Sequence, residues 1–250
     1  MAVCEIQLNQ VSSLGKMASF YAIVPEGKTG PFPVYYLLHG LSDNHTAWTR
    51  RTSLERYVSG VPIIVIMPDG ERSFFTDSVT TPTEAFETYI ARDLIGFVDS
   101  AFNTIATAKG RAIGGLSMGG YGAIKLALKH PDLFSAAYSH SGALEAASYN
   151  ISPSWANATE RKGIFGPKPK GGPDDIMALI KTFTPESIPS LAIDCGVDDF
   201  LIESNRKAHK LLKSLGLPHE YAEFPGAHSW DYWDLHVQDA IRFLTKHFGL

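Results

Sequence analysis

One serine lies in a glycine-rich setting that favours nucleophilic chemistry. Residues 114–120 read Gly-Gly-Leu-Ser-Met-Gly-Gly and contain the pattern Gly-x-Ser-x-Gly, with Ser117 at its centre. In a nucleophile elbow, the serine occupies a strained turn between a strand and a helix, and the flanking glycines let neighbouring backbone pass close to it. A glycine-rich turn with an uninvolved serine would show the same pattern. Because a short strand-like segment precedes this turn and a helical pattern follows it, we predict that Ser117 is a nucleophile.

A histidine near the C-terminus is placed to activate this serine. A serine hydroxyl needs a base at neutral pH, and in hydrolases with this elbow the acid and then the histidine follow the serine along the chain. His228 comes just after a predicted strand at residues 219–224. Catalytic groups gather at the carboxyl edge of open α/β sheets. A histidine on a surface loop is the alternative, but this position favours His228 as the general base.

Adjacent aspartates compete for the third position of the triad. Asp198 and Asp199 follow a predicted strand at residues 191–195. We expect one of them to contact His228 and the other to cap the next helix. Asp194, inside the strand itself, is a weaker option. The order of these residues therefore predicts a Ser-His-Asp triad whose acid the spacing alone leaves open.

Two backbone N–H groups are candidates for an oxyanion hole. One should belong to Met118, the residue after the nucleophile, and the other should come from the loop after the strand that ends at residue 38. In that loop we predict the backbone of Leu41, with His39 packed beside the hole and His45 on the loop. No His/Cys/Asp cluster has zinc spacing, and no phosphate-binding loop is present. We therefore expect neither a metal nor a cofactor.

The elements that would position these groups alternate between strand and helix. Unbroken apolar runs bounded by Pro and Gly are typical of strands buried on both faces of a parallel sheet. From residue 34 onward, the alternation predicts a mostly parallel, doubly wound α/β sheet. Predicted strands cover residues 4–8, 17–24, 34–38, 63–67, 111–114, 134–139, 191–195 and 219–224, of which the first two are expected to be antiparallel. Predicted helices cover residues 84–101, 121–129, 201–215 and 232–247.

One stretch interrupts this alternation. Residues 150–189 are rich in Pro and Gly, which few long helices tolerate, yet they also contain Trp155 and Phe165. We interpret the stretch as a loop-rich cap inserted in a single domain that spans residues 1–250. The bulky side chains of Trp155 and Phe165 are expected to contact substrate by closing over an acyl pocket.

The composition narrows the possible partners. The chain has 250 residues, a net charge of −4 and two cysteines, and no basic face is implied, so nucleic acid is not expected as a partner. Two cysteines make no disulfide framework, which fits a reducing compartment. We expect no signal peptide and no membrane span, because the N-terminus lacks a basic region followed by an apolar run and the longest apolar runs are strand-sized. The mature form of a secreted protein would show the same features. The sequence thus favours a cytoplasmic protein that acts on small molecules, with a homo-oligomer left open.

Several stretches together resemble one family of hydrolases. The chain is similar to the putative-esterase family of α/β hydrolases, which includes esterase D (S-formylglutathione hydrolase), tributyrin and acetyl esterases, feruloyl esterases and mycolyltransferases. The matching stretches are YYLLHGLSDNHTAW (35–48), MPDGERSFFTD (67–77), RAIGGLSMGGYGAIKLAL (111–128), CGVDDFL (195–201) and FPGAHSWDYW (224–233). Because they are spread along most of the chain, the resemblance implies the α/β-hydrolase fold throughout.

The resemblance also implies a serine carboxylesterase that hydrolyses short-chain acyl esters through an acyl-enzyme intermediate. The family motif Gly-x-x-Asp before Phe maps onto Gly196 and Asp199, which favours Asp199 over Asp198 as the acid. S-formylglutathione hydrolases are expected to carry a cysteine where this chain has Ser42-Asp43-Asn44, so the chain looks closer to small bacterial esterases. The alternatives are an S-formylglutathione hydrolase, an acyltransferase, and a non-catalytic binding protein that keeps the fold.

Overall fold

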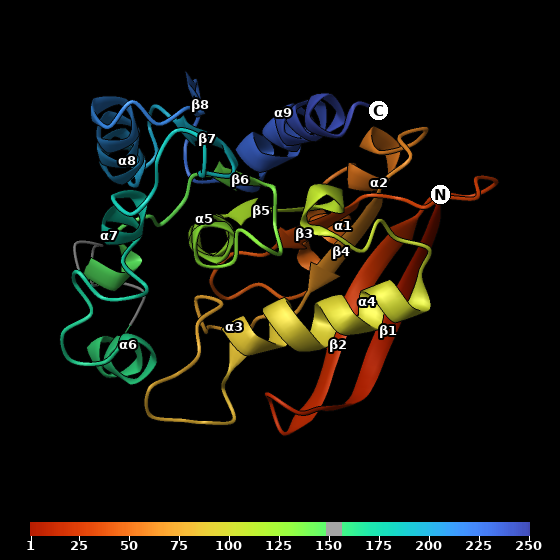
Figure 1. Cartoon of the computed structure of the whole chain (residues 1–250), viewed down its shortest axis with the longest axis horizontal. Coiled ribbons are helices and arrows are strands. Elements are labelled where there is room, and N and C mark those ends of the chain that lie inside the picture. Colours follow the sequence, from red (N-terminus) through yellow and green to blue (C-terminus); the bar gives the residue numbers. More distant parts are fainter. Residues whose placement is uncertain (149–156) are drawn as a thin grey trace.

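The fold is organised by one sheet of eight strands. The computed structural model describes residues 1–148 and 157–250. The strand order is β1-β2-β4-β3-β5-β6-β7-β8 (Figure 1). The strands are β1 (Ala2–Val11), β2 (Lys16–Val24), β3 (Val34–Leu38), β4 (Ile64–Pro68), β5 (Arg111–Leu116), β6 (Ala136–His140), β7 (Ser190–Gly196) and β8 (Glu220–Phe224). β1 and β2 are antiparallel, and all pairs from β4 to β8 are parallel, as predicted.

The register of the parallel strands brings their carboxyl ends to one edge. Leu38 at the end of β3 pairs with Gly115 near the end of β5, and His140 at the end of β6 pairs with Leu116. Farther along the sheet, Gly196 at the end of β7 pairs with Phe224 at the end of β8. The loops that leave β3, β5, β7 and β8 therefore start side by side, and these loops carry the candidate catalytic residues.

Both faces of the central strands are buried, as their unbroken apolar runs predict. Along β3, Tyr36 belongs to a core cluster on one face, whereas Tyr35 and Leu37 belong to a cluster on the other. Since side chains of a strand alternate between its faces, each cluster needs its own layer of helices. This requirement explains why helices cover both sides of the sheet (Figure 1).

The two helical layers differ in composition. One layer contains α1 (Ala47–Arg51), α2 (Leu54–Tyr57) and α9 (Trp230–Phe248), whose apolar residues join the cluster around Tyr35. The other contains α3 (Phe86–Thr88), a π-helical segment (Tyr89–Leu94), α4 (Ile95–Ala101), α5 (Met118–Lys129) and α8 (Ile202–Ser214). The helix predicted over 84–101 therefore begins two residues late and contains a π-helical turn. Tyr89, Leu94 and Val98 of this segment are fully buried, and Phe97 is partly buried against the same core.

Where the structure describes it, from residue 157 onward, the Pro- and Gly-rich stretch contains only short helices, as its composition predicts. These are α6 (Ala158–Phe165) and α7 (Ile176–Ile180). Each begins with a side-chain cap: Asn157 accepts a hydrogen bond from the Thr159 N–H, and Asp175 accepts one from the Met177 N–H. The C-terminal part of α6 packs on the loop before α3, where the Thr80 N–H donates to the Gly163 carbonyl at 3.2 Å.

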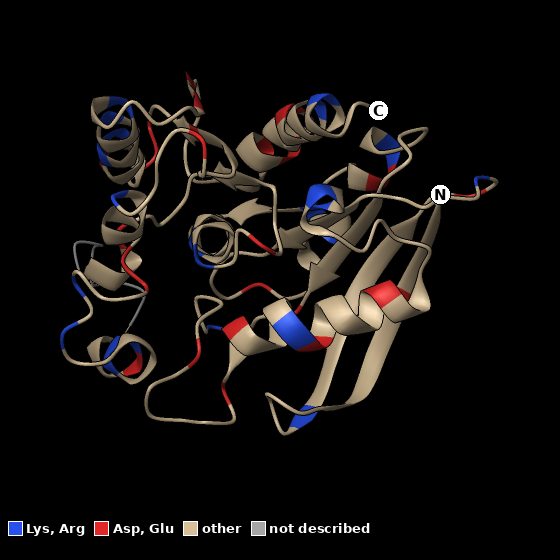
Figure 2. Cartoon of the chain, viewed as in Figure 1, with Lys and Arg blue, Asp and Glu red and all other residues tan. Residues whose placement is uncertain are grey.

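Lys and Arg residues are interspersed with Asp and Glu on the helices and loops of the described residues (Figure 2). In the part of the chain that the structure describes, no helix combines the length and the apolar character needed to span a membrane.

Candidate active site

Ser117 occupies the strained turn that the glycine pattern predicts. It lies between β5 and α5 with φ 52° and ψ −112°, a backbone conformation that non-glycine residues rarely adopt. The end of β3 passes directly behind the turn. A Cβ atom on Gly119 would lie 2.5 Å from the Leu38 carbonyl oxygen and 2.6 Å from that of His39. The glycine is therefore required by this close approach of backbone.

His228 lies in the loop between β8 and α9 and reaches both of its expected partners. Its Nε2 is 3.0 Å from Ser117 Oγ, and its Nδ1 is 2.8 Å from Asp199 Oδ2. The Asp199 side chain is fully buried, whereas the imidazole is 17% exposed. A buried carboxylate that accepts the Nδ1–H fixes the tautomer in which Nε2 can take a proton from the serine. The structure thus brings Ser117, His228 and Asp199 together in the order that a triad needs.

The neighbouring aspartates have other roles. Asp198 is exposed, and its backbone N–H donates to the Gly226 carbonyl. The expectation that the second aspartate caps the following helix is wrong: no side chain caps α8, and Asp199 itself accepts the Leu201 N–H at 2.8 Å through Oδ1. The Asp199 carboxylate therefore holds both the imidazole and the backbone that leads into α8, because each of its oxygens has a different partner.

Asp194 belongs to a separate buried network behind the triad. Its Oδ2 accepts a hydrogen bond from His140 Nδ1 at 2.7 Å, and its Oδ1 accepts one from the Tyr232 hydroxyl at 2.9 Å. His140 and Asp194 are both fully buried. Since the Ser117 N–H donates to the His140 carbonyl, this network supports the elbow from behind without contacting the reacting oxygen.

The two predicted oxyanion donors belong to the start of α5 and to the loop after β3. Met118 opens α5, so its N–H is one of the helix-terminal donors that have no intrahelical acceptor. Leu41 belongs to the loop after β3 and lines the cavity at Ser117. Within the described residues, neither N–H donates to another group. Both are therefore available to a developing oxyanion.

The two loop histidines hold this loop in place. The buried His39 is within 2.8 Å of the Gly40 carbonyl through Nδ1 and accepts the Gly70 N–H through Nε2. His45 also belongs to this loop, and its ion-pair contact with Asp69, 3.5 Å from Nδ1 to Oδ2, raises its pKa against the opposing effect of burial. No group of three or more metal-ligating side chains occurs among the described residues.

A cavity of about 350 Å³ opens beside Ser117. His228 is flanked by Phe200, whose ring centroid lies 4.5 Å from that of the imidazole, and by Trp233 at 4.8 Å. Trp230 completes this aromatic wall and packs edge-on against Trp48 at 5.4 Å. None of these aromatic residues was predicted as a site residue, although Phe200, Trp230 and Trp233 lie close to Asp199 or His228 along the chain.

Two charged residues also line this cavity and were not predicted. Burial raises the pKa of Asp43, although the nearby His39 partly opposes the shift. Arg72 lies on the loop between β4 and α3. It forms a bidentate ion pair with Glu160 of α6, with distances of 2.6 and 2.9 Å. Both residues belong to irregular loops, and the sequence has no periodic pattern there from which the loop conformation could be predicted.

Phe165, one of the two residues expected to close over the acyl pocket, lies elsewhere. Phe165 is buried in the core beneath the cap, where it contacts Phe74 and Tyr121 with ring centroids 5.5 and 5.9 Å away. It is not among the described residues that line the cavity at Ser117. A large aromatic ring at the end of α6 is more stable against the core than in an open site. Trp155 lies outside the described residues.

Comparison with curated proteins identifies relatives along most of the chain. An acetyl esterase of Caldicellulosiruptor saccharolyticus is 32% identical over 220 residues, which cover 84% of this chain and 82% of the relative. An esterase of Mycobacterium tuberculosis is 28% identical and matches 88% of this chain. The chain spans about half the length of that second relative, 54%.

Solved structures with the same fold include a fluorophosphonate-binding serine hydrolase of Staphylococcus aureus. It is 28% identical, with a TM-score of 0.88 over 97% of this chain and 98% of that one. An S-formylglutathione hydrolase of the same organism is 29% identical, with a TM-score of 0.84 over 98% and 99% of the two chains. The model of the Putative esterase family matches residues 12–244. The chain is therefore an esterase with the α/β-hydrolase fold and belongs to the Putative esterase family.

Proposed function

We propose that this esterase is a carboxylesterase that hydrolyses short-chain acyl esters through a Ser117–His228–Asp199 triad. The observation that carries the proposal is the continuous hydrogen-bonded path from Ser117 Oγ through His228 to the buried Asp199 carboxylate, with distances of 3.0 and 2.8 Å. This path opens onto a cavity in which an ester carbonyl can approach the serine.

The proposed reaction has two acyl-transfer steps. Ser117 Oγ attacks the ester carbonyl carbon while His228 Nε2 takes the hydroxyl proton, and Asp199 stabilises the imidazolium. The N–H groups of Leu41 and Met118 donate to the oxyanion of the tetrahedral intermediate. The intermediate collapses to an acyl-enzyme as His228 returns the proton to the departing alcohol. Water activated by the same imidazole then releases the acid.

The dimensions of the cavity support a short acyl group. Its volume of about 350 Å³ lies near the lower end of the range usual for ligand pockets, about 300–1,000 Å³. Phe200, Trp230 and Trp233 form one of its walls. A long acyl chain would extend past these rings into water and gain little further burial.

A panel of p-nitrophenyl esters tests this function. Acetate and butyrate should give a higher kcat/KM than decanoate, and Ser117→Ala should abolish the difference by removing turnover of all three. Ser59→Ala, at an exposed serine outside the site, is the control and should behave as wild type. A clear preference for decanoate would contradict the proposed acyl range.

A thioester substrate is the second candidate, because one similar structure is an S-formylglutathione hydrolase. The loop after β3, residues 39–46, contains no cysteine, which favours oxygen esters. Parallel assays with S-formylglutathione and with p-nitrophenyl acetate distinguish the two, since the preferred substrate should give the higher kcat/KM.

We also propose a cytoplasmic location. Cys4 is exposed and Cys195 is buried, and neither forms a disulfide. An unpaired exposed thiol fits a reducing compartment. Fractionation of cells followed by immunoblotting tests this location.

A further inference from the structure

A second cavity adjoins the catalytic one. It has a volume of about 480 Å³ and lies between α6 and the loop that leads into α3. Arg72 lines both cavities. An ester bound at Ser117 has an acyl side and an alcohol side, so whichever side extends across Arg72 enters the second cavity. The volume lies within the usual range for ligand pockets.

Most of the residues that line this cavity carry a hydroxyl or a carboxylate group. Its hydroxyl-bearing residues are Ser73, Thr76, Ser78, Thr80, Thr81 and Thr159. Three glutamates, Glu71, Glu84 and Glu160, outnumber the one arginine. An anionic ligand is disfavoured by this charge balance. A long acyl chain is disfavoured as well, because it would cover polar groups without hydrogen-bonding to them.

The lining also includes an aromatic surface. Phe86 contributes its ring and Ile164 an aliphatic side chain. A ligand that offers hydroxyl groups around an apolar ring face could use both parts of the lining. We therefore propose, building on the proposed esterase function, that this cavity binds the alcohol portion of the ester and that this portion is polyhydroxylated, as in an acylated sugar.

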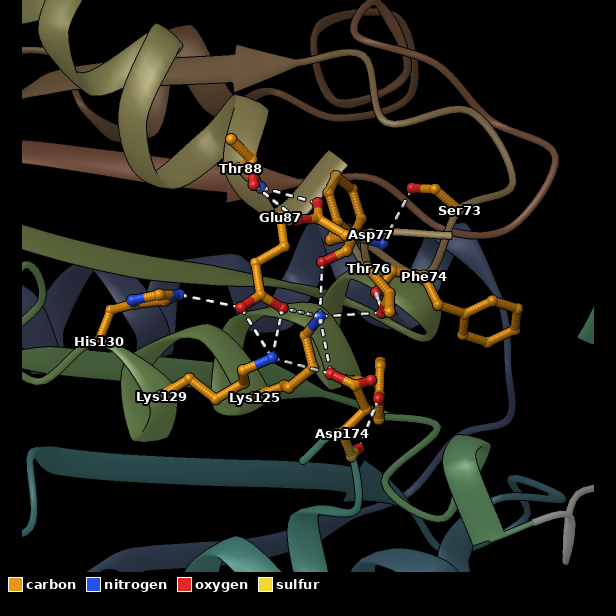
Figure 3. A network of polar contacts seen from close by, with 12 residues as sticks. Ser73, Phe74, Thr76, Asp77, Glu87, Thr88, Lys125, Lys129, His130 and Asp174 are labelled. Carbon is orange, nitrogen blue, oxygen red and sulfur yellow. Dashed lines mark hydrogen bonds and ion pairs between the residues drawn. The ribbon is translucent and has the colours of Figure 1, made fainter. Parts of the chain in front are cut away.

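The wall formed by the loop before α3 is held from beneath by a buried charge network (Figure 3). The fully buried Lys125 of α5 donates to the Phe75 carbonyl at 2.7 Å and to Thr76 Oγ1 at 2.9 Å. Its Nζ also lies 2.7 Å from a carboxylate oxygen of Glu87 on α3. Burial lowers the pKa of Lys125, and Glu87 opposes this shift by stabilising the charged form.

The opposite wall, formed by α6 of the cap, is tied to the loop before α3. Arg72 holds Glu160 through the bidentate pair, and Ser78 Oγ donates to the Gly163 carbonyl at 3.1 Å. Because both walls are fixed by internal hydrogen bonds, the cavity is preformed. A preformed site loses less conformational entropy when a ligand binds.

Two esters with the same acetyl group and different alcohols test the proposal. Wild type should hydrolyse 6-O-acetylglucose with a kcat/KM at least about tenfold above that for ethyl acetate, the effect of about two net hydrogen bonds. Thr159→Trp, at an exposed position on the rim, should fill the cavity. It should cost about tenfold in kcat/KM on the sugar ester and leave ethyl acetate within about twofold.

Because Thr159 lies on α6, its substitution could disturb the cap, so a second variant is placed outside the cap. Glu84→Gln preserves size and should raise KM for the sugar ester without changing kcat for ethyl acetate. Thr107→Trp, at an exposed residue before β5 and so at the opposite sheet edge, should change neither ester. The proposal would be overturned if Thr159→Trp and Glu84→Gln lowered kcat/KM equally for both esters, or lowered it for neither. Failure of wild type to hydrolyse either ester would overturn the proposed function together with this inference.

Discussion

Replacement of Asp199 by Asn should remove the negative charge of the acid while keeping the size and position of its side chain. The carboxylate uses Oδ2 for His228 Nδ1 and Oδ1 for the Leu201 N–H. An asparagine that keeps its oxygen on Leu201 must turn its NH₂ toward the imidazole. Nδ1 would then accept a hydrogen bond, the ring proton would move to Nε2, and the imidazole could no longer take the proton of Ser117.

The expected loss follows from this change of tautomer. Asp199→Asn should lower kcat by up to about 10⁴-fold at neutral pH, as documented for the same change in another serine hydrolase, which corresponds to about 5.5 kcal/mol of transition-state stabilisation. Asp198→Asn is the matched control, because Asp198 is exposed and uses its backbone N–H rather than its side chain to bind Gly226. Its kcat and its melting temperature should stay close to those of wild type.

Steady-state hydrolysis of p-nitrophenyl acetate and thermal melting of both variants provide the measurement. A folded Asp199→Asn protein with near-normal kcat would refute the role given to the carboxylate. An inactive Asp198→Asn protein would show that the acid had been assigned one residue too late.

The remaining predictions concern the metal, the elbow and pH. Activity should survive EDTA treatment, and a loss that zinc restores would argue for a metal-dependent mechanism. Gly119→Ala should reduce both activity and the melting temperature, because its Cβ would lie 2.5 Å from the Leu38 carbonyl oxygen; an unchanged melting curve would mean that the backbone moves aside freely. Although burial opposes it, hydrogen bonds from Arg92 and Ser13 lower the pKa of Asp93 to about 2. Asp93 therefore contributes stability above its unfolded pKa of about 3.9 that is lost as pH falls toward 2, so Asp93→Asn should narrow the difference in melting temperature between pH 6 and pH 3.

The sheet and the placement of the candidate triad at its carboxyl edge were predictable because local patterns determine them. Unbroken apolar runs such as residues 34–38 correspond to strands buried on both faces, and the glycines around Ser117 are required by close backbone contacts. The order of serine, acid and histidine then follows from the strand order. Only the resemblance to the esterase family favoured Asp199 over Asp198 as the acid, because the spacing does not show which carboxylate points inward.

The lining of the two cavities was not predictable in the same way. Arg72 and Asp43 belong to loops held by long-range contacts, such as the bond from the Gly70 N–H to His39. Phe165 was expected over the site, but its ring is buried against Phe74 and Tyr121. A bulky residue in a Pro-rich segment can pack against the core or against a ligand, and its type alone does not distinguish these environments.

The central claim is that Ser117 is the nucleophile, and covalent labelling tests it most directly. A fluorophosphonate should modify wild type at one serine, and peptide mass spectrometry should locate the adduct on Ser117. His228→Ala should slow the labelling strongly, since it removes the base 3.0 Å from the hydroxyl. Ser117→Ala should remain folded and unlabelled. Equal labelling of wild type and Ser117→Ala, or an adduct on another serine of the active wild-type protein, would contradict the account.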